Sequence, residues 1–214
     1  YYKMAADKGQ IDAMFNYGVI AFNGEGVLMN KKEAVAYIKN AADNGNADGM
    51  NNIARMLQGG IGITKDLKLA FKYFKKASET GNTRAMNSTG FMLHKGFGTE
   101  KNDEEAIKYF KMGAKSGSPV SMNNYAEMLE KGEGSPENRK NEAKALKYFK
   151  RAAEMNDPNA MYNYARFLER GVHVTKNIEL AIDFYKKSAS LRNPDGMYNY
   201  ARMLEQVTHD NEKA

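Results

Sequence analysis

The side chains that could perform acid–base, nucleophilic or metal chemistry are few and scattered in this sequence. Its three histidines, His94, His173 and His209, lie in different parts of the chain, and no metal-ligand spacing relates them. The chain has no cysteine, which excludes disulfides, thiolate zinc sites and cysteine nucleophiles. We therefore expect no catalytic residue, no metal site and no cofactor.

One glycine-rich segment invites comparison with a phosphate-binding loop. Gly59-Gly60-Ile61-Gly62 lacks the lysine and the hydroxyl residue that such a loop uses to hold phosphates. Glycines at this density also end helices, because glycine readily adopts the left-handed backbone conformation. The segment is therefore expected to terminate a helix, and the sequence predicts that the chain is not an enzyme.

The elements that would position any functional side chain follow an internal repeat. A phrase built on methionine, a small residue and asparagine or tyrosine recurs with Met14, Met50, Met86, Met122, Met161 and Met197. The step is 36 residues except for one step of 39, where three residues are added in the segment 135–144. A period of this length is typical of helical repeat proteins. Repeats of this kind stack on one another, since a single unit cannot bury its own apolar face.

Each unit is expected to form two helices. In the first helix, Met14, Tyr17 and Gly18 have the spacing that places them on one face. That helix ends at Gly24–Gly26, and the second helix runs to a turn at Gly45. The sequence thus predicts an all-α, right-handed α-solenoid of helix-turn-helix repeats. We expect a single domain over residues 1–214, with a partial unit 1–9, repeats 10–45, 46–81, 82–117, 118–156 and 157–192, and a partial unit 193–214.

The repeat resembles a known family. The run Ala13-x-x-x-Tyr17-Gly18, the loop Gly24-x-Gly26 and the later Ala34 and Gly45 resemble the Sel-one-like repeat, a relative of the tetratricopeptide repeat. The resemblance spans nearly the whole chain, with departures such as His173 in place of the second loop glycine. It implies a protein-interaction scaffold or adaptor. The family that the chain resembles also includes arrays attached to catalytic domains such as kinases, and a regulatory array of that type remains an alternative.

A column of asparagines marks a candidate binding face. Asn16 and its equivalents lie about 150° from the centre of the packed side of the first helix. Asparagine is unfavourable inside helices because its amide competes with backbone hydrogen bonds. Neighbouring columns carry tyrosine and arginine, which are common interface anchors. The candidate partner-binding residues of the concave groove are Asn16, Asn52, Asn124, Asn163, Asn199, Tyr162, Tyr198, Arg55, Arg166 and Arg202.

Two interpretations of this column stay open. In the functional one, exposed amides hold the main chain of an extended partner peptide. In the structural one, each asparagine forms a hydrogen bond with the adjacent helix. The two are not exclusive.

A second column consists of lysines, at Lys3, Lys39, Lys75, Lys111, Lys150 and Lys186. With a net charge of +6, such a stripe could contact phosphates. Acidic residues beside the lysines and few free aromatics favour a solvated surface instead, so nucleic-acid binding is not favoured.

The partner class expected from the sequence is a protein or peptide. End-to-end self-association as a structural segment is an alternative, through surfaces such as Tyr1-Tyr2 and 198–203. The chain contains no run of about 20 apolar residues, so no membrane span is expected. The absence of cysteine favours the cytoplasm, with the lumen of the endoplasmic reticulum as the second compartment.

Overall fold

The computed structural model describes the backbone of residues 1–213 and the side chains of residues 1–206. Over this part of the chain it contains helices and loops but no strand, which confirms the all-α fold. Contacts divide the chain into two compact units, unit 1 (Tyr1–Tyr109) and unit 2 (Phe110–Ala214). His209 lies outside the residues whose side chains are described.

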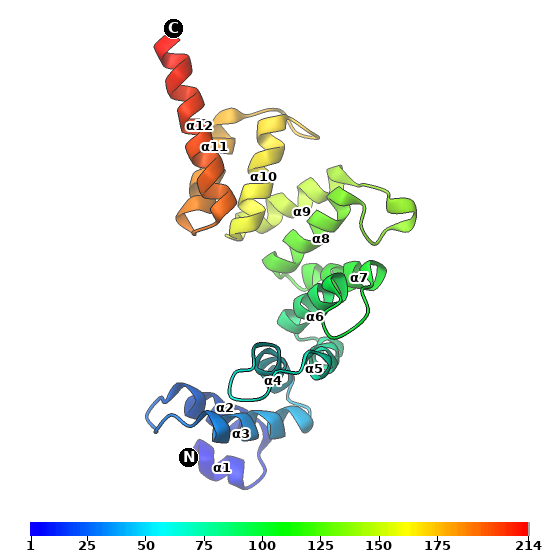
Figure 1. Ribbon diagram of the computed structural model, residues 1–214, viewed down its shortest axis with the longest axis vertical. Coiled ribbons are helices and arrows are strands. Elements are labelled where there is room, and N and C mark those ends of the chain that lie inside the picture. The colour runs from blue at the N-terminus through cyan, green and yellow to red at the C-terminus, as the bar shows by residue number, and fades with distance from the viewer. Residues whose placement is uncertain (214) are drawn as a thin grey trace. The chain divides into compact units, whose positions relative to one another are not determined.

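The helices alternate between the two types expected from the repeat. Odd-numbered helices are the second helices of the repeats, and even-numbered helices are the first (Figure 1). Unit 1 contains α1 (Tyr2–Asp7), α2 (Ile11–Asn23), α3 (Lys31–Asp43), α4 (Ala47–Gly59), α5 (Leu67–Glu79) and α6 (Thr83–Lys95). The helix α7 (Asp103–Lys115) spans the boundary. Unit 2 contains α8 (Pro119–Lys131), the 3₁₀ turn η1 (Pro136–Asn138), α9 (Glu142–Glu154), α10 (Pro158–Arg170), α11 (Ile178–Ser190) and α12 (Pro194–Lys213).

Consecutive helices pack against each other within each unit. In unit 1, α2 contacts α3, α3 contacts α4, and α4 contacts α5. In unit 2 the same sequence of contacts links α8 to α9, α9 to α10, and α10 to α11. Even-numbered helices therefore also approach one another, and α10 contacts both α8 and α12. This is the stacking of helical hairpins that defines an α-solenoid.

Capping residues set where the even-numbered helices begin and end. The side chain of Asn46 accepts a hydrogen bond from the backbone amide of Gly49 at 2.6 Å, and Asn82 does the same for α6. The helices end at glycines in the left-handed conformation, such as Gly24 (φ 73°) and Gly60 (φ 68°). These are the glycines at which the sequence predicts helix ends.

The capping asparagines also connect neighbouring even-numbered helices. The amide nitrogen of Asn46 donates to Asp12 of α2 at 2.9 Å, and that of Asn82 donates to Asp48 of α4 at 2.9 Å. In unit 2, Asn193 donates to Asn159 of α10 at 2.7 Å. Each of these side chains therefore stabilises the start of its own helix and a contact with the helix before it.

The core consists of the methionine, aromatic and small-residue columns. The methionines of the repeat are buried from Met14 to Met161, while Met197 on α12 is 45% exposed. Small residues allow close helix contacts: a Cβ added to Gly18 would lie 2.6 Å from Cγ1 of Ile38. The core role expected for the methionine column is thus observed in all but its last member.

The one longer loop leaves the helices intact. In the segment 135–144, Glu137 and Asn138 adopt positive φ angles of 58° and 50°, while α8 and α9 keep 13 residues each. His173, which replaces a loop glycine, also adopts a positive φ of 57°. A non-glycine residue is strained in this conformation.

Candidate partner-binding site

The predicted groove residues lie on even-numbered helices and fall into two groups with different surroundings. In unit 1 they are Asn16 on α2 and Asn52 and Arg55 on α4. In unit 2 they are Asn124 on α8, Tyr162, Asn163 and Arg166 on α10, and Tyr198, Asn199 and Arg202 on α12.

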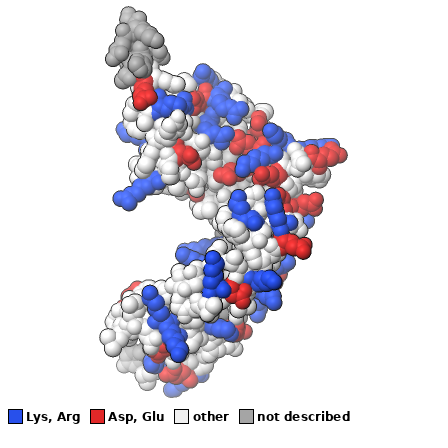
Figure 2. All heavy atoms as spheres, viewed as in Figure 1, with Lys and Arg blue, Asp and Glu red and all other residues white. Residues whose placement is uncertain are grey.

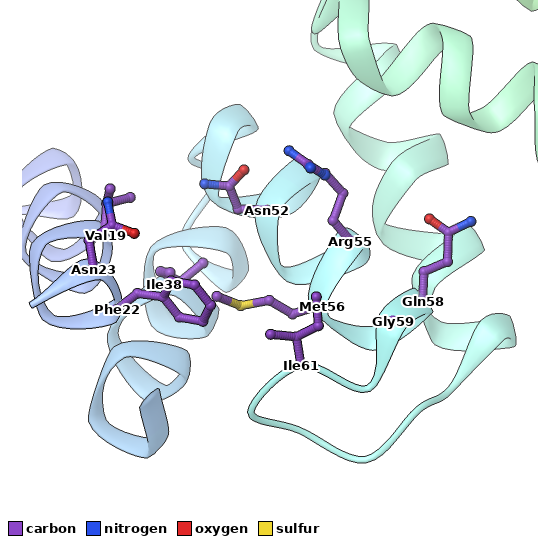
Figure 3. Close-up of a pocket in the computed structure, with 10 residues that line it drawn as sticks. All are labelled: Val19, Phe22, Asn23, Ile38, Asn52, Arg55, Met56, Gln58, Gly59 and Ile61. Carbon is purple, nitrogen blue, oxygen red and sulfur yellow. The ribbon is translucent and has the colours of Figure 1, made fainter. Parts of the chain in front are cut away.

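Unit 1 contains a cavity of about 450 Å³ between α2 and α4 (Figure 3). Two predicted residues, Asn52 and Arg55, line it. The remaining lining residues are Val19, Phe22, Asn23, Ile38, Met56, Gln58, Gly59 and Ile61. The cavity is therefore built mainly by two successive first helices, with α3 and the loop after α4 completing it.

The cavity combines an apolar interior with a polar edge. Figure 3 shows the side chains of Phe22, Ile38, Met56 and Ile61 converging, while Asn52 and Arg55 extend from α4 beside them. Ile38 and Met56 are almost completely buried, whereas Ile61 is 46% exposed. An apolar side chain of moderate size could therefore enter the cavity and leave polar atoms near the edge.

In contrast to their equivalents in unit 2, Asn52 and Arg55 make no hydrogen bond or ion pair with the described residues. The repeat register explains this difference. Arg55 occupies the ninth position of its helix, as do Arg166 and Arg202. In unit 2 the twelfth position of the preceding even-numbered helix carries a glutamate, but in α2 this position carries Phe22.

The two predicted groove arginines of unit 2, Arg166 and Arg202, are paired with these glutamates. Nη2 of Arg166 donates to Oε1 of Glu130 at 3.1 Å, and Nη2 of Arg202 donates to Oε1 of Glu169 at 2.8 Å. All four side chains are partly buried, where an ion pair is screened less than at an open surface. These contacts link α8 to α10 and α10 to α12.

Asn163 is integrated into the same network and is only 5% exposed. Its amide nitrogen donates to Oδ1 of Asn123 at 3.0 Å and to Oε1 of Glu127 at 3.3 Å. Its Oδ1 accepts from Nη1 of Arg166 at 3.0 Å. The side chain expected to be an exposed peptide clamp is thus buried by the preceding even-numbered helix, in agreement with the structural interpretation.

The other predicted residues of unit 2 vary in exposure. Asn199 accepts from Arg202 and donates to the carbonyl of Asp195, and Asn124 is partly buried and has an interaction partner. The guanidinium of Arg166 lies 5.7 Å from the ring centre of Tyr162. Tyr198 is 70% exposed, so it is the most accessible of the predicted aromatic anchors.

Glu169 also accepts a hydrogen bond from a buried tyrosine. The hydroxyl of Tyr185 donates to Oε2 of Glu169 at 2.7 Å. Burial of the phenol, together with this carboxylate, raises the pKa of Tyr185 well above its ordinary value. Glu169 thus accepts hydrogen bonds from both Tyr185 and Arg202, which hold its carboxylate between α11 and α12.

A gap in the asparagine column leaves one buried acceptor without a donor. Asn51 occupies the position of Asn123, is 2% exposed, and its Oδ1 accepts no hydrogen bond from the described residues. The residue that would donate to it is Ser88, the one non-asparagine in the column. The hydroxyl of Ser88 donates instead to the carbonyl of Arg84 at 3.2 Å.

The lysine column forms a mixed-charge surface. Lys3 pairs with Glu33 at 3.0 Å, and Lys75 pairs with Glu105 at 3.2 Å. Figure 2 shows basic and acidic side chains interspersed on the face that it displays. This arrangement fits the solvated surface favoured by the sequence.

The histidines whose side chains are described each lie beside a single acidic side chain and do not form a cluster. Nδ1 of His94 lies 2.7 Å from Asp103, and Nε2 of His173 lies 3.6 Å from Glu142. Among the described residues, no group of three or more histidine or acidic side chains could hold a metal ion. None of the described helices combines the length and apolarity needed to cross a membrane.

The sequence matches the family model of the Sel1 repeat. The matched segments are residues 11–46, 47–82, 83–118, 119–157 and 158–193, and each begins at the first residue of an even-numbered helix. No curated protein matches the sequence.

Several solved structures are similar to this chain. One is c5321, a protective antigen of uropathogenic Escherichia coli strains with an SLR fold, at a TM-score of 0.83 and 31% identity. The match covers 94% of this chain and 43% of the antigen, so this chain spans less than half of the antigen's length. A Sel1 repeat protein from Oxalobacter formigenes matches at a TM-score of 0.80 and 26% identity, over 88% of this chain and 76% of that one. The immunity protein Pa5087 from Pseudomonas aeruginosa shares the fold alone, at a TM-score of 0.54 and 20% identity, over 91% of this chain and 72% of that one.

Proposed function

This chain belongs to the Sel1 repeat family, and we propose that it is a scaffold that binds an extended segment of a partner protein on the face of its even-numbered helices. Sel1 repeat proteins generally mediate protein–protein interaction and are typically non-catalytic. The cavity between α2 and α4 carries the proposal. It combines a largely apolar lining with three polar side chains, Asn52, Arg55 and Gln58, that have no partner among the described residues. Binding sites characteristically have this composition, since apolar contact provides affinity and a few polar groups fix orientation.

Within the predicted groove, this proposal gives different roles to the two units. Asn52 and Arg55 contact the partner directly, with Asn16 on the same face of α2. Asn163, Arg166 and Arg202 maintain the spacing of the even-numbered helices through their hydrogen bonds to the preceding even-numbered helix, and Asn199 orients Arg202 within α12. Tyr162, Tyr198 and Asn124 belong to a secondary contact surface, in which the exposed ring of Tyr198 is the main anchor.

Methyl NMR tests where a partner segment binds. Peptides are selected from a random display library against the immobilised chain and are then titrated into protein carrying ¹³C-labelled methionine methyl groups. Met56 lines the cavity, and Met128 is the matched control, because it occupies the same helix position in unit 2 and is also buried. We expect the Met56 methyl resonance to shift and that of Met128 to stay unchanged. Selected peptides that leave Met56 unaffected would contradict the proposal.

Self-association is the second candidate function. It is supported by exposed apolar side chains on α1 and α12, including Tyr2 and Met4 on the former and Met197 and Tyr198 on the latter. Sedimentation equilibrium across a concentration series distinguishes the two candidates. A single monomer mass at all concentrations excludes self-association, whereas a mass that rises with concentration and falls in Tyr198→Ser supports it.

A further inference from the structure

Unit 2 provides an internal template for what is missing in unit 1. Twice, an arginine at the ninth position of an even-numbered helix pairs with a glutamate at the twelfth position of the preceding one, Arg166 with Glu130 and Arg202 with Glu169. The recurrence shows that the spacing between successive even-numbered helices suits a guanidinium–carboxylate pair. Such pairs are among the strongest polar contacts in proteins, because the planar guanidinium offers several donors to the carboxylate.

At α2 and α4 the arginine remains but the glutamate is replaced. Phe22 occupies the twelfth position of α2, and its ring forms part of the cavity lining. Among the residues whose side chains are described, none that lines the cavity is acidic. The replacement therefore has two effects at one location: it leaves Arg55 without a counterion in the described part of the chain, and it makes the adjoining surface apolar.

Asn52 repeats the same pattern one turn earlier. Its equivalent Asn163 donates to the amide oxygen of Asn123 and to Glu127 on the preceding even-numbered helix. On α2 the corresponding positions carry Phe15 and Val19, which offer no side-chain acceptor. The amide group of Asn52 is thus available for a peptide carbonyl supplied from outside.

We infer that the cavity recognises an extended partner segment in which an acidic side chain lies two residues from an apolar one. The acidic group pairs with Arg55, where the repeat elsewhere supplies its own glutamate. The apolar side chain enters the cavity against Phe22, Met56 and Ile61. Residues i and i+2 of an extended chain point to the same side and lie about 7 Å apart, so both can face the cavity while Asn52 binds the main chain between them.

This inference rests on the proposed function but makes a narrower claim, since it specifies the charge and spacing of the ligand. A polyanion such as nucleic acid fits the cavity less well. Arg55 is the one cationic residue among the described residues that line it, and the interior is largely apolar. The occupant to which the geometry points is therefore a protein segment with a side-chain carboxylate.

The first test compares peptide sequences and affinities across three variants. Phe22→Glu reintroduces the glutamate found in α8 and α10, so that Arg55 is paired internally. Arg55→Glu reverses the charge of an exposed residue, and Arg84→Glu makes the same change on the exposed surface of α6, outside the cavity. We expect peptides selected on the unaltered chain to be enriched in Asp or Glu two residues from Leu, Ile, Met or Phe. The dissociation constants should rise about tenfold or more in the first two variants and change less than twofold in Arg84→Glu.

A second selection of peptides uses the Arg55→Glu variant as the immobilised protein. It keeps the test decisive if Phe22→Glu fails to fold. Here we expect Lys or Arg to replace the acidic residue at the same spacing. Peptides that shift Met56 but show no acidic preference, or that bind Arg55→Glu with unchanged affinity, would overturn this inference and leave the proposed function standing. If no selected peptide perturbs Met56, the proposed function fails, and this inference fails with it.

Discussion

Replacing equivalent asparagines in the two units should have opposite effects on stability. Asn163→Ala removes the hydrogen bonds to Asn123 and Glu127 and the one accepted from Arg166. It also leaves Oδ1 of the buried Asn123 without its donor. Asn52→Ala changes the same residue type at the same helix position but removes no hydrogen bond to the described residues.

The magnitude follows from these contacts. A lost hydrogen bond costs about 1 kcal/mol, and an unsatisfied buried acceptor adds about 1–3 kcal/mol. Alanine recovers about 0.5 kcal/mol through its higher helix propensity. Arg166 keeps its pair with Glu130, which limits the loss on that side. We therefore expect Asn163→Ala to lower the free energy of unfolding by about 2.5–4.5 kcal/mol, and Asn52→Ala to raise it by about 0.5 kcal/mol.

Urea unfolding followed by circular dichroism measures both changes. Because the two substitutions lie in different units, hydrogen exchange of the α10 and α4 backbone amides locates each effect. Protection should fall in α10 of Asn163→Ala and rise slightly in α4 of Asn52→Ala. Equal destabilisation by both substitutions would refute the assignment of Asn163 to a structural network and of Asn52 to a free binding surface.

Three further substitutions test the packing of unit 1. Ser88→Asn should raise the free energy of unfolding by about 1 kcal/mol in urea titrations, by donating to Oδ1 of Asn51, and the gain should vanish in an Asn51→Ala background. Gly18→Ala places a Cβ 2.6 Å from Cγ1 of Ile38 and should lower stability by about 1–3 kcal/mol. The double variant with Ile38→Phe, the pairing used in the next repeat, should recover most of this loss. The hydrogen bond that the Tyr37 hydroxyl donates to the carboxylate of Asp7 on α1 raises the pKa of the phenol to about 12. Since the folded pKa lies above the unfolded one, the stability difference between the unaltered chain and Tyr37→Phe should be full below pH 10 and disappear as the pH approaches 12.

The helices and their ends could be predicted from the sequence because each depends on local residues at a repeated spacing. Gly24 and Gly60 end helices through their own backbone conformation, and the capping residue before Pro158 starts α10 in the predicted turn. The repeat also identified the family and the all-α solenoid correctly. These features depend on the residue pattern within one repeat, and its recurrence along the chain makes that pattern evident.

The site could be predicted only in part, because burial on the even-numbered helices depends on contacts between repeats. The angle around a single helix places Asn163 far from the packed side, yet α8 covers it and supplies its hydrogen-bond partners. The cavity was missed for the same reason. Its signal was present in the sequence, since Phe22 occupies the position of Glu130 and Glu169. That exchange acquires meaning only once the structure shows which positions of adjacent helices meet.

The capping side chains that connect successive even-numbered helices have a consequence for how such arrays grow by gene duplication. The repeat that begins at Asn46 carries both partners of this hydrogen bond. The amide donor is the capping residue Asn46, and the acceptor Asp48 lies two residues later. If this repeat were duplicated in tandem, the capping amide of the second copy could donate to the aspartate of the first copy. The repeat that begins at Ser118 has Val120 at the acceptor position, so a tandem copy of it would not form this hydrogen bond. Duplication of some repeats would thus preserve the hydrogen bond between successive even-numbered helices, and duplication of others would lose it.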